Sequence, residues 1–224
     1  MAITAAMVKE LLDMTCADIK ENKKALNETN GNMDEAVEYL RKNGQAKAEK
    51  KAGRIAAEGL CKVIVKNDTT AAVVEVNSET DFVAKNADFQ AYVEAVATQA
   101  VESDAADMDA FLAESWNLDS SKTVKEALVE KIAVIGENLS IRRFEKVVAS
   151  NGCVVSYIHG GGRIGVIVEA DTDVVNDDIK EAMTNIAMQV AALNPEYISR
   201  DEISADELAK MREITVDSAL NDTF

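Results

Sequence analysis

The sequence predicts an α+β fold, in which an N-terminal bundle of three helices precedes a core of two similar subdomains, each an antiparallel sheet packed with helices. Apolar residues recur with helical spacing through the first part of the chain. From Gly59 onward, short runs rich in β-branched residues flank turn residues and then give way to helical patterns. Gln99 and Gln189, 90 residues apart, end similar helices, which indicates a duplicated unit.

The composition disfavours several classes of function. A chain of 224 residues is long enough to bury a substantial core. Its net charge of -16 argues against general binding to nucleic acid, because neutralisation of phosphates supplies most of that affinity, and against binding to a membrane surface. The sequence has no long apolar run and no N-terminal basic segment followed by an apolar stretch. We therefore expect a soluble, cytoplasmic protein.

The cysteines and the single histidine predict no metal site. Cys16, Cys61 and Cys153 are widely spaced and odd in number, and His159 is the only histidine. Structural zinc sites need clustered Cys or His ligands, which this spacing does not provide. Reduced thiols are the expected state, as is usual in the cytoplasm.

The three N-terminal helices are predicted from caps and spacing. Thr4 can cap the first helix, the second spans about residues 19–28, and Asn30-Gly31 marks a turn. Asn32 and Glu35 form a reciprocal capping pair for the third. The apolar positions of the first helix are Met7, Val8, Leu11, Leu12 and Met14. A bundle of this size is equally compatible with a packing appendage and with a partner-binding module.

Residues 41–54 form a basic segment in an otherwise acidic chain. Arginine and lysine occur here at six positions, against one glutamate. A solvated linker or helix face is the usual explanation of such a run. Electrostatic steering toward an acidic partner is compatible with it.

A β-hairpin and three helices are predicted to form the first half of the core. The hairpin pairs residues 61–65 with 71–76. The first helix begins near Asp88, the second is shorter and ends at Trp116, and the third is capped by Thr123 with Glu126. The first helix carries its apolar stripe at Phe89, Tyr92, Val93, Val96 and Ala100. The third carries it at Val124, Leu128, Ile132 and Ile135.

The rest of the chain is predicted to hold one more strand and then to repeat the hairpin and helix. A strand over 141–148 leads to a hairpin of 153–158 with 163–168, and a helix follows Asn176 and ends at Asn194-Pro195. We expect its inward positions to be Ile179, Met183, Ile186, Val190 and Leu193. A final acidic helix is capped by Ser204 and Glu207. Its apolar side comprises Leu208, Met211, Thr215 and Ala219 and needs a surface to lie against.

The segment Glu75–Lys85, which reads EVNSETDFVAK, is the most informative part of the chain. It begins as a strand and breaks in a polar cluster, so Asp81 and Phe82 fall in the connection before the next helix. A large aromatic residue is unusual in a polar connection. Phe82 is either a plug that folds back onto the core or an anchor for a partner's pocket. Base rates of burial favour the plug.

Residues for catalysis are not evident. His159 has no nucleophile in an elbow motif near it, and the carboxylates are spread over helical faces. The run Gly160–Gly162 lacks a following helix N-terminus and a Walker lysine, so a hairpin turn explains it better than a phosphate loop. We therefore expect no catalytic residue, cofactor or metal.

Several motifs in order resemble the translation elongation factor Ts family. The run EVNSETDFVAK is similar to its signature, and the match continues through residues 135–143 (IGENLSIRR), His159-Gly160 and residues 163–166 (RIGV). Lys23-Lys24-Ala25-Leu26 fits the N-terminal module of that family, which resembles a ubiquitin-associated three-helix fold. The resemblance covers essentially the whole chain.

The resemblance implies a non-catalytic guanine nucleotide exchange factor. Its partner would be elongation factor Tu, in the GDP-bound and nucleotide-free states, and GDP would leave as Mg²⁺ and phosphate contacts are displaced. Phe82 would enter an apolar pocket with Asp81 at its rim. The implied partner-binding residues are Thr80, Asp81, Phe82, Val83, Lys23, Lys24, His159 and Gly160. No direct contact with nucleic acid or membrane is implied, and a homodimer is compatible with the sequence.

The resemblance also implies a domain division, and the chain departs from the family's sequence pattern in two places. Residues 1–54 would form the partner-binding module and basic linker, 55–150 the first subdomain, and 151–224 the second with its acidic helix. The glycines that the family has between its first two helices are replaced here. Cys16 and Asp18 stand in their places, and Glu21 and Asn22 stand where the family has Asp-Cys before Lys-Lys-Ala-Leu. The family's last segments do not follow Phe224, so we expect a shortened second subdomain with an exposed sheet edge or helix face. An adaptor that binds without promoting exchange is the alternative function.

Overall fold

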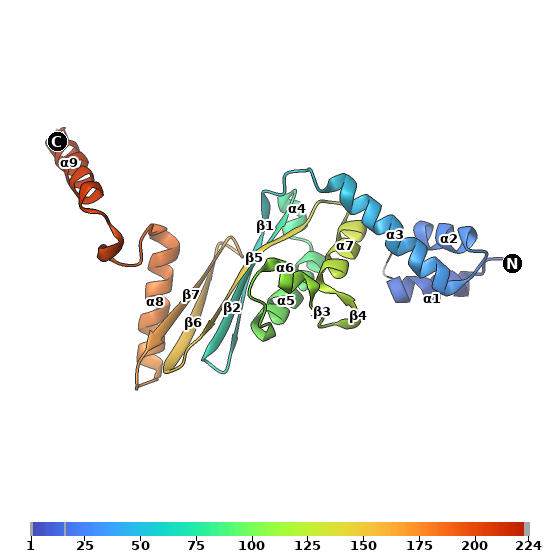
Figure 1. Ribbon diagram of the computed structural model, residues 1–224, viewed down its shortest axis with the longest axis horizontal. Coiled ribbons are helices and arrows are strands. Elements are labelled where there is room, and N and C mark those ends of the chain that lie inside the picture. Colours follow the sequence, from blue (N-terminus) through green and yellow to red (C-terminus); the bar gives the residue numbers. More distant parts are fainter. Residues whose placement is uncertain (1, 16, 222–224) are drawn as a thin grey trace.

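The computed structural model describes residues 2–15 and 17–221, so Cys16 and Phe224 lie outside the described part. Within that part the chain combines helices with antiparallel sheets, which confirms the α+β prediction. The first three helices lie at one end of the molecule, and the sheets and the remaining helices follow (Figure 1). None of the helices in the described ranges is long and apolar enough to cross a membrane.

The N-terminal bundle consists of α1 (Ala5–Thr15), α2 (Ile19–Glu28) and α3 (Met33–Lys51). Its core is fully buried and comprises Leu11, Ala25, Leu26 and Ala36. The predicted cap of α3 is confirmed, because the amide of Glu35 donates to Asn32 Oδ1 at 3.2 Å and Asn32 Nδ2 donates to Glu35 Oε1 at 2.9 Å. Such a cap satisfies amide groups that have no partner in the first helical turn.

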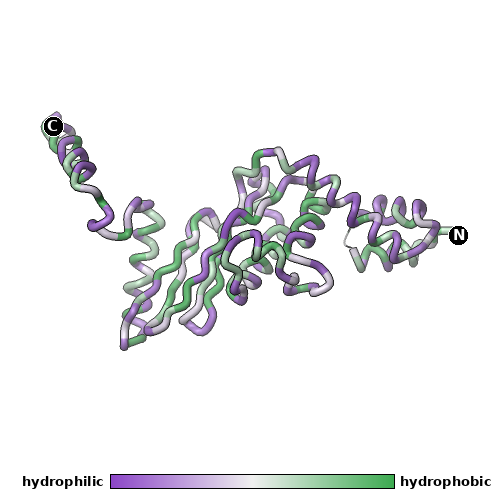
Figure 2. The backbone as a smooth tube through the Cα atoms, viewed as in Figure 1, coloured by the Kyte–Doolittle hydropathy of each residue, from purple (hydrophilic) through white to green (hydrophobic). Residues whose placement is uncertain are grey.

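Most of the basic segment is helical, which agrees with the helix-face explanation of its charge. Helix α3 continues to Lys51, where Lys50 and Lys51 lie in the last turn and complement the negative end of the helix dipole. Gly44 lies inside this helix, and a Cβ placed there would stand 3.7 Å from the Cβ of Ala133 on α7 (Val124–Ile135). That distance is an ordinary van der Waals contact, so α3 and α7 lie against each other at Gly44 with room for a methyl group. Hydrophilic residues predominate along α3, and hydrophobic ones are concentrated in the strands of the core (Figure 2).

The first sheet has the strand order β1-β2-β5 and is entirely antiparallel. Strands β1 (Glu58–Lys66) and β2 (Thr70–Ser78) form the predicted hairpin, and β5 (Ser140–Val148) pairs with β2. Asn67 and Asp68 both have positive φ angles, 55° and 58°, in the turn. Two consecutive positive φ angles match the right-handed twist of the flanking strands.

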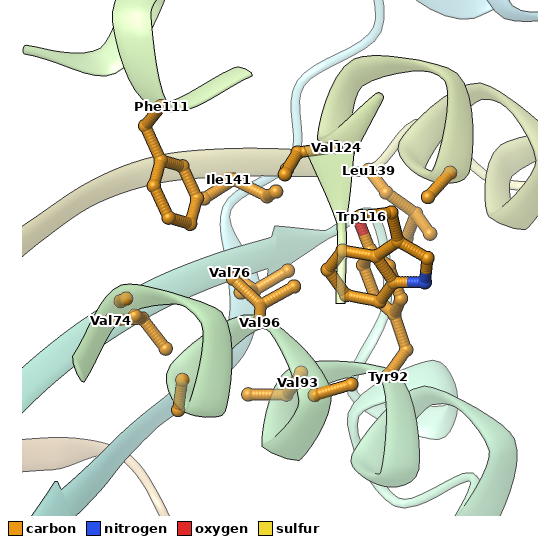
Figure 3. Close-up of a cluster of buried hydrophobic side chains, with 14 of the residues drawn as sticks. Val74, Val76, Tyr92, Val93, Val96, Phe111, Trp116, Val124, Leu139 and Ile141 are labelled. Carbon is orange, nitrogen blue, oxygen red and sulfur yellow. The ribbon is translucent and has the colours of Figure 1, made fainter. Parts of the chain in front are cut away.

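Helix α5 (Ala87–Glu102) covers one face of this sheet and forms the main core with it (Figure 3). Strand β2 contributes alternate residues to this core, as expected for a strand with one face against helices. The central buried side chains are Val74, Val76, Phe89, Val93, Val96, Phe111, Val124 and Ile141.

Between α5 and α7 the prediction was wrong for Trp116. Helix α6 (Met108–Ala113) ends before it, and Trp116 lies in a small hairpin of β3 (Ser115–Trp116) with β4 (Asp119–Thr123). Its ring packs against Tyr92 at a centroid distance of 5.9 Å. The strands are too short to show an alternating pattern in the sequence. The predicted cap of α7 is confirmed, since Thr123 and Glu126 form a complete capping box.

The second hairpin packs against the outer face of the first sheet. Strands β6 (Gly152–His159) and β7 (Ile164–Asp171) pair with each other and contact β1 and β2. A Cβ at Gly165 would approach the Val73 side chain to 3.0 Å and the Cβ of Cys61 to 3.2 Å. The absence of a side chain there permits the close approach. The core thus has four layers, in the order α5, three-stranded sheet, two-stranded sheet and α8 (Asp177–Leu193) (Figure 1).

Two predicted inward residues of α8 are exposed. Ile186 is 53% exposed and Leu193 is 73% exposed, whereas Met183 and Ala187 are buried. With 3.6 residues per turn, Ile186 and Leu193 lie roughly 60° and 80° around the helix from Met183. A two-stranded sheet covers only the narrow stripe centred on Met183, and these two residues fall on its flank.

The predicted C-terminal helix is α9 (Ala205–Asn221), which follows a short 3₁₀ segment, Arg200–Glu202. The amide of Glu207 donates to Ser204 Oγ at 3.2 Å, which confirms the predicted cap. Within the described residues, none of α9 is buried, and its predicted apolar positions Leu208 and Met211 are 42% and 38% exposed. The helix extends away from the four layers (Figure 1).

Candidate functional site

The segment after β2 folds into one helical turn, α4 (Asp81–Ala84). Thr80 has an extended backbone, and its hydroxyl accepts a hydrogen bond from the amide of Val83 at 3.4 Å. Asn86 then caps α5 by accepting from the amides of Asp88 and Phe89. The sequence places Asp81 and Phe82 in a connection before a helix near Asp88. In the structure this helix, α5, begins at Ala87, one residue before the predicted start, and the short capped turn α4 precedes it.

Phe82 projects from this turn into solvent. It is 80% exposed, whereas Ala84 is buried and Val83 packs against the main core. A turn of this length has a single inward side, and the smaller residues occupy it. The interpretation of Phe82 as a core plug is therefore wrong. An exposed phenyl ring on a rigidly capped turn is suited to burial in a partner's pocket.

Asp81 is ionised and paired on the same turn. Lys85 Nζ lies 2.6 Å from Asp81 Oδ2, and both side chains are exposed. The hydrogen bond from Lys85 is the main cause that lowers the pKa of Asp81 below its ordinary range, and the positive charges of Lys85 and Arg163 act in the same direction. The β6–β7 turn that carries Arg163 is hydrogen-bonded to β1, and α4 contacts the same strand.

The β6–β7 turn presents the second group of predicted site residues. His159 ends β6, and its Nδ1 lies 2.9 Å from the hydroxyl of Tyr157. Gly160, Gly161 and Gly162 all have positive φ angles, of 60°, 69° and 102°. The carbonyl of Gly162 accepts a hydrogen bond from the amide of Cys61 at 2.6 Å, which fixes the turn to β1. The geometry is that of a hairpin turn joined to the first sheet.

Lys23 and Lys24 lie on a different surface. Both are exposed on α2, while the next two residues, Ala25 and Leu26, are buried in the bundle. Helix α2 and α4 belong to separate parts of the molecule (Figure 1). The predicted site residues thus form one region at α4 and the β6–β7 turn, and a remote one on α2.

The altered turn between α1 and α2 is closed by Asn22. This side chain is fully buried, and its Nδ2 donates to the carbonyl of Ala17 at 2.7 Å and to that of Asp18 at 3.2 Å. Its Oδ1 accepts from the hydroxyl of Thr15 at 3.0 Å. A buried side-chain amide therefore satisfies the carbonyls of Ala17 and Asp18 before α2.

Metal-ligating side chains do not cluster in the described ranges. Residues 2–15 and 17–221 contain no group of three or more His, Cys, Asp or Glu side chains that could hold a metal ion. Burial raises the pKa of the Cys61 thiol, which disfavours the reactive thiolate. A shallow groove of about 470 Å³ runs along α8, and its lining includes Ile186, Gln189 and Leu193. These residues are not among the predicted site residues.

Comparison with known proteins gives a consistent result. The family model described as "Elongation factor TS" matches residues 79–223, which include α4 and the β6–β7 turn. The chain is 49% identical to "Elongation factor Ts" of Clostridioides difficile (strain 630), over 98% of this chain and 72% of that protein. It is 48% identical to "Elongation factor Ts" of Halothermothrix orenii, over 99% of this chain and 74% of that protein.

Proposed function

The chain belongs to the elongation factor Ts family, and we propose from this that it is a guanine nucleotide exchange factor for elongation factor Tu. One structural observation supports the proposal above the others. Phe82, within the segment that resembles the family signature, is 80% exposed on a capped helical turn. Exposure of a large aromatic side chain to water is unfavourable in the free protein. Burial of that side chain in a partner's pocket removes this cost and stabilises the complex.

In the proposed complex, Phe82 enters an apolar pocket of elongation factor Tu, and Thr80, Asp81 and Val83 surround the entry. His159 and Gly160 form a second contact at the β6–β7 turn. Lys23 and Lys24 form a third contact through the N-terminal module. We assign residues 1–54 to the partner-binding module and its basic linker. Residues 55–150 form the first subdomain, which carries the Phe82 contact. Residues 151–224 form the second, which carries the contact at His159 and Gly160.

The mechanism is negative coupling between two ligands of elongation factor Tu. A factor that binds the nucleotide-free partner more tightly than the GDP-bound form must weaken GDP binding by the same ratio. Insertion of Phe82 displaces contacts to Mg²⁺ and phosphate, and no covalent step is required. Truncation of a central aromatic anchor typically costs about 2–4 kcal/mol. That range corresponds to roughly 30- to 1,000-fold in affinity.

Release of a fluorescent GDP analogue from elongation factor Tu tests the proposal. Catalytic amounts of the chain should accelerate release, and the acceleration should shrink when EDTA removes Mg²⁺ beforehand. Binding to nucleotide-free elongation factor Tu is measured in parallel. Binding without acceleration would identify an adaptor, and an unchanged release rate at stoichiometric protein would refute the exchange function.

A further inference from the structure

Glu137 lies beside the proposed anchor although it comes from a distant part of the chain. It follows Gly136, which ends α7 with a left-handed φ of 86°. Its Oε2 accepts hydrogen bonds from the amides of Glu79 and Thr80, at 3.0 and 3.1 Å. Its Oε1 accepts from the hydroxyl of Thr80 at 2.6 Å. One carboxylate therefore binds three donors of the segment that leads into α4.

The same two segments are joined in the opposite direction. The amide of Asn138 donates to Glu79 Oε1 at 2.6 Å, and Asn138 Nδ2 donates to the carbonyl of Arg54 at 2.8 Å. Arg54 in turn pairs with Glu79 at 3.4 Å. The end of α7 and the start of α4 are thus held by reciprocal hydrogen bonds.

Thr80 connects Glu137 to the orientation of α4. A hydroxyl has one proton and two acceptor positions. Because Thr80 Oγ1 donates its proton in the hydrogen bond to Glu137, a lone pair of the same oxygen is directed toward the amide of Val83, which Thr80 caps. The rotamer of Thr80, the start of α4 and the direction in which Phe82 projects are therefore determined together.

We propose that Glu137 is a positioning residue for nucleotide exchange, which holds Glu79 and Thr80 so that Phe82 is presented in its binding orientation before the partner arrives. The proposal rests on the proposed function. A preorganised turn avoids the loss of conformational entropy that a mobile one incurs on binding. Hydrogen bonds to an ionised acceptor are also stronger than those between neutral groups.

Substitution Glu137→Gln tests this role. The glutamine has a similar shape, but its NH2 group cannot accept hydrogen bonds as the replaced carboxylate oxygen does, so at least one donor of Glu79 or Thr80 loses its partner. We expect stimulated GDP release to fall about tenfold, from the usual effect of losing a hydrogen bond to a charged group. Amide hydrogen exchange of Glu79 and Thr80 should become faster, while that of Gln90 on α5 should not change.

Glu114→Gln is the matched control. Glu114 is a partly buried carboxylate that accepts from Ser103 Oγ at 2.7 Å and from Gln99 Nε2 at 2.9 Å, on the α5–α6 side of the core. The Glu114→Gln variant should lose about as much stability in urea as Glu137→Gln and keep full exchange activity. Equal loss of activity in both variants would show that general stability is responsible and would overturn the positioning role.

A double-mutant cycle with Phe82→Ala separates positioning from other roles. If Glu137 acts through Phe82, Glu137→Gln should change release by less than about twofold in the Phe82→Ala background. The effects of two substitutions that act through the same group are not additive. Independent effects would overturn the proposal, as would full activity of Glu137→Gln alone. If the wild-type chain does not stimulate release at all, the proposed function fails and the positioning role fails with it.

A second pair of variants applies if Glu137→Gln loses its cooperative urea transition. Thr80→Ser keeps the hydroxyl that donates to Glu137, whereas Thr80→Val removes it at nearly the same volume. We expect Thr80→Val to lose about tenfold in stimulated release, by the same hydrogen-bond argument, and to show faster amide exchange of Val83, and Thr80→Ser to show a smaller change of both. Equal activity of the two would overturn the proposal.

Discussion

Phe82 and Phe89 lie on successive helices and have opposite environments, the first 80% exposed and the second completely buried. Helix α4 is a single turn, and Val83 and Ala84 occupy its inward side, so the phenyl ring of Phe82 faces solvent. Helix α5 is long enough to bury a full stripe against the sheet, and Phe89 lies in that stripe. Two residues of the same type therefore make separable contributions to binding and to stability.

Phe82→Ala should reduce stimulated GDP release at least tenfold and leave the fold unchanged. The substitution removes an anchor that contributes to binding and makes little contact within the free chain. Release kinetics, circular dichroism and the urea midpoint are measured together. Leu118→Ala is the control, because Leu118 is 73% exposed in the β3–β4 turn and should affect neither property. A large loss of helicity in Phe82→Ala would contradict the surface role.

Phe89→Ala should lower the free energy of unfolding by about 3–5 kcal/mol, the usual cost of removing a buried phenyl ring and leaving a cavity. The cavity would lie between α5 and β2, in the cluster that contains Val74 and Val93. Urea unfolding followed by circular dichroism measures the change. Phe82→Ala is the comparison, with an expected change within about 0.5 kcal/mol. Similar losses in both variants would contradict the assignment of Phe89 to the core.

Local sequence signals predict most of the helices and strands but not the contacts between them. Capping pairs such as Thr123 with Glu126 act within a few residues, so the sequence alone predicts them. Exposure of Phe82 depends on which residues of α4 face the core, and Trp116 lies in strands too short for a pattern. Burial of α8 depends on the width of the sheet beneath it. The hydrogen bonds that Thr80 donates to Glu137 join segments 57 residues apart and depend on the docking of α7.

Gly165→Ala should destabilise the chain by about 1–3 kcal/mol, the usual cost of overpacking a close contact. The added methyl group would lie 3.0 Å from the Val73 side chain and 3.2 Å from the Cβ of Cys61, so the two sheets would have to separate. Urea unfolding measures the effect. Gly53→Ala is the control, because a Cβ there meets nothing within 4 Å, and its change should stay within about 0.5 kcal/mol. An equal effect of the two substitutions would contradict the close packing of the sheets.

The capping box of α7 should make stability depend on pH in the acidic range. The hydrogen bond from the amide of Thr123 is the main cause that lowers the pKa of Glu126 below its ordinary range, with further contributions from the Thr123 hydroxyl and from Arg41. A carboxyl group whose pKa is lower in the folded state stabilises the fold above its unfolded pKa, about 4.3 for Glu. That contribution disappears as the pH falls through the folded pKa.

The measurement is the difference in free energy of unfolding between the wild type and Glu126→Gln, from urea titrations between pH 7 and pH 3. The wild type should be the more stable at pH 7, and the difference should begin to shrink below about pH 4.3. Repeating the comparison in an Arg41→Gln background isolates the ion pair between α3 and α7, in which Arg41 Nη1 lies 2.8 Å from Glu126 Oε1. A smaller difference in that background would assign part of the effect to the pair, since Arg41 favours the ionised form of Glu126. A difference that stays constant from pH 7 to pH 3 would show that Glu126 stabilises α7 through its shape and not through its charge.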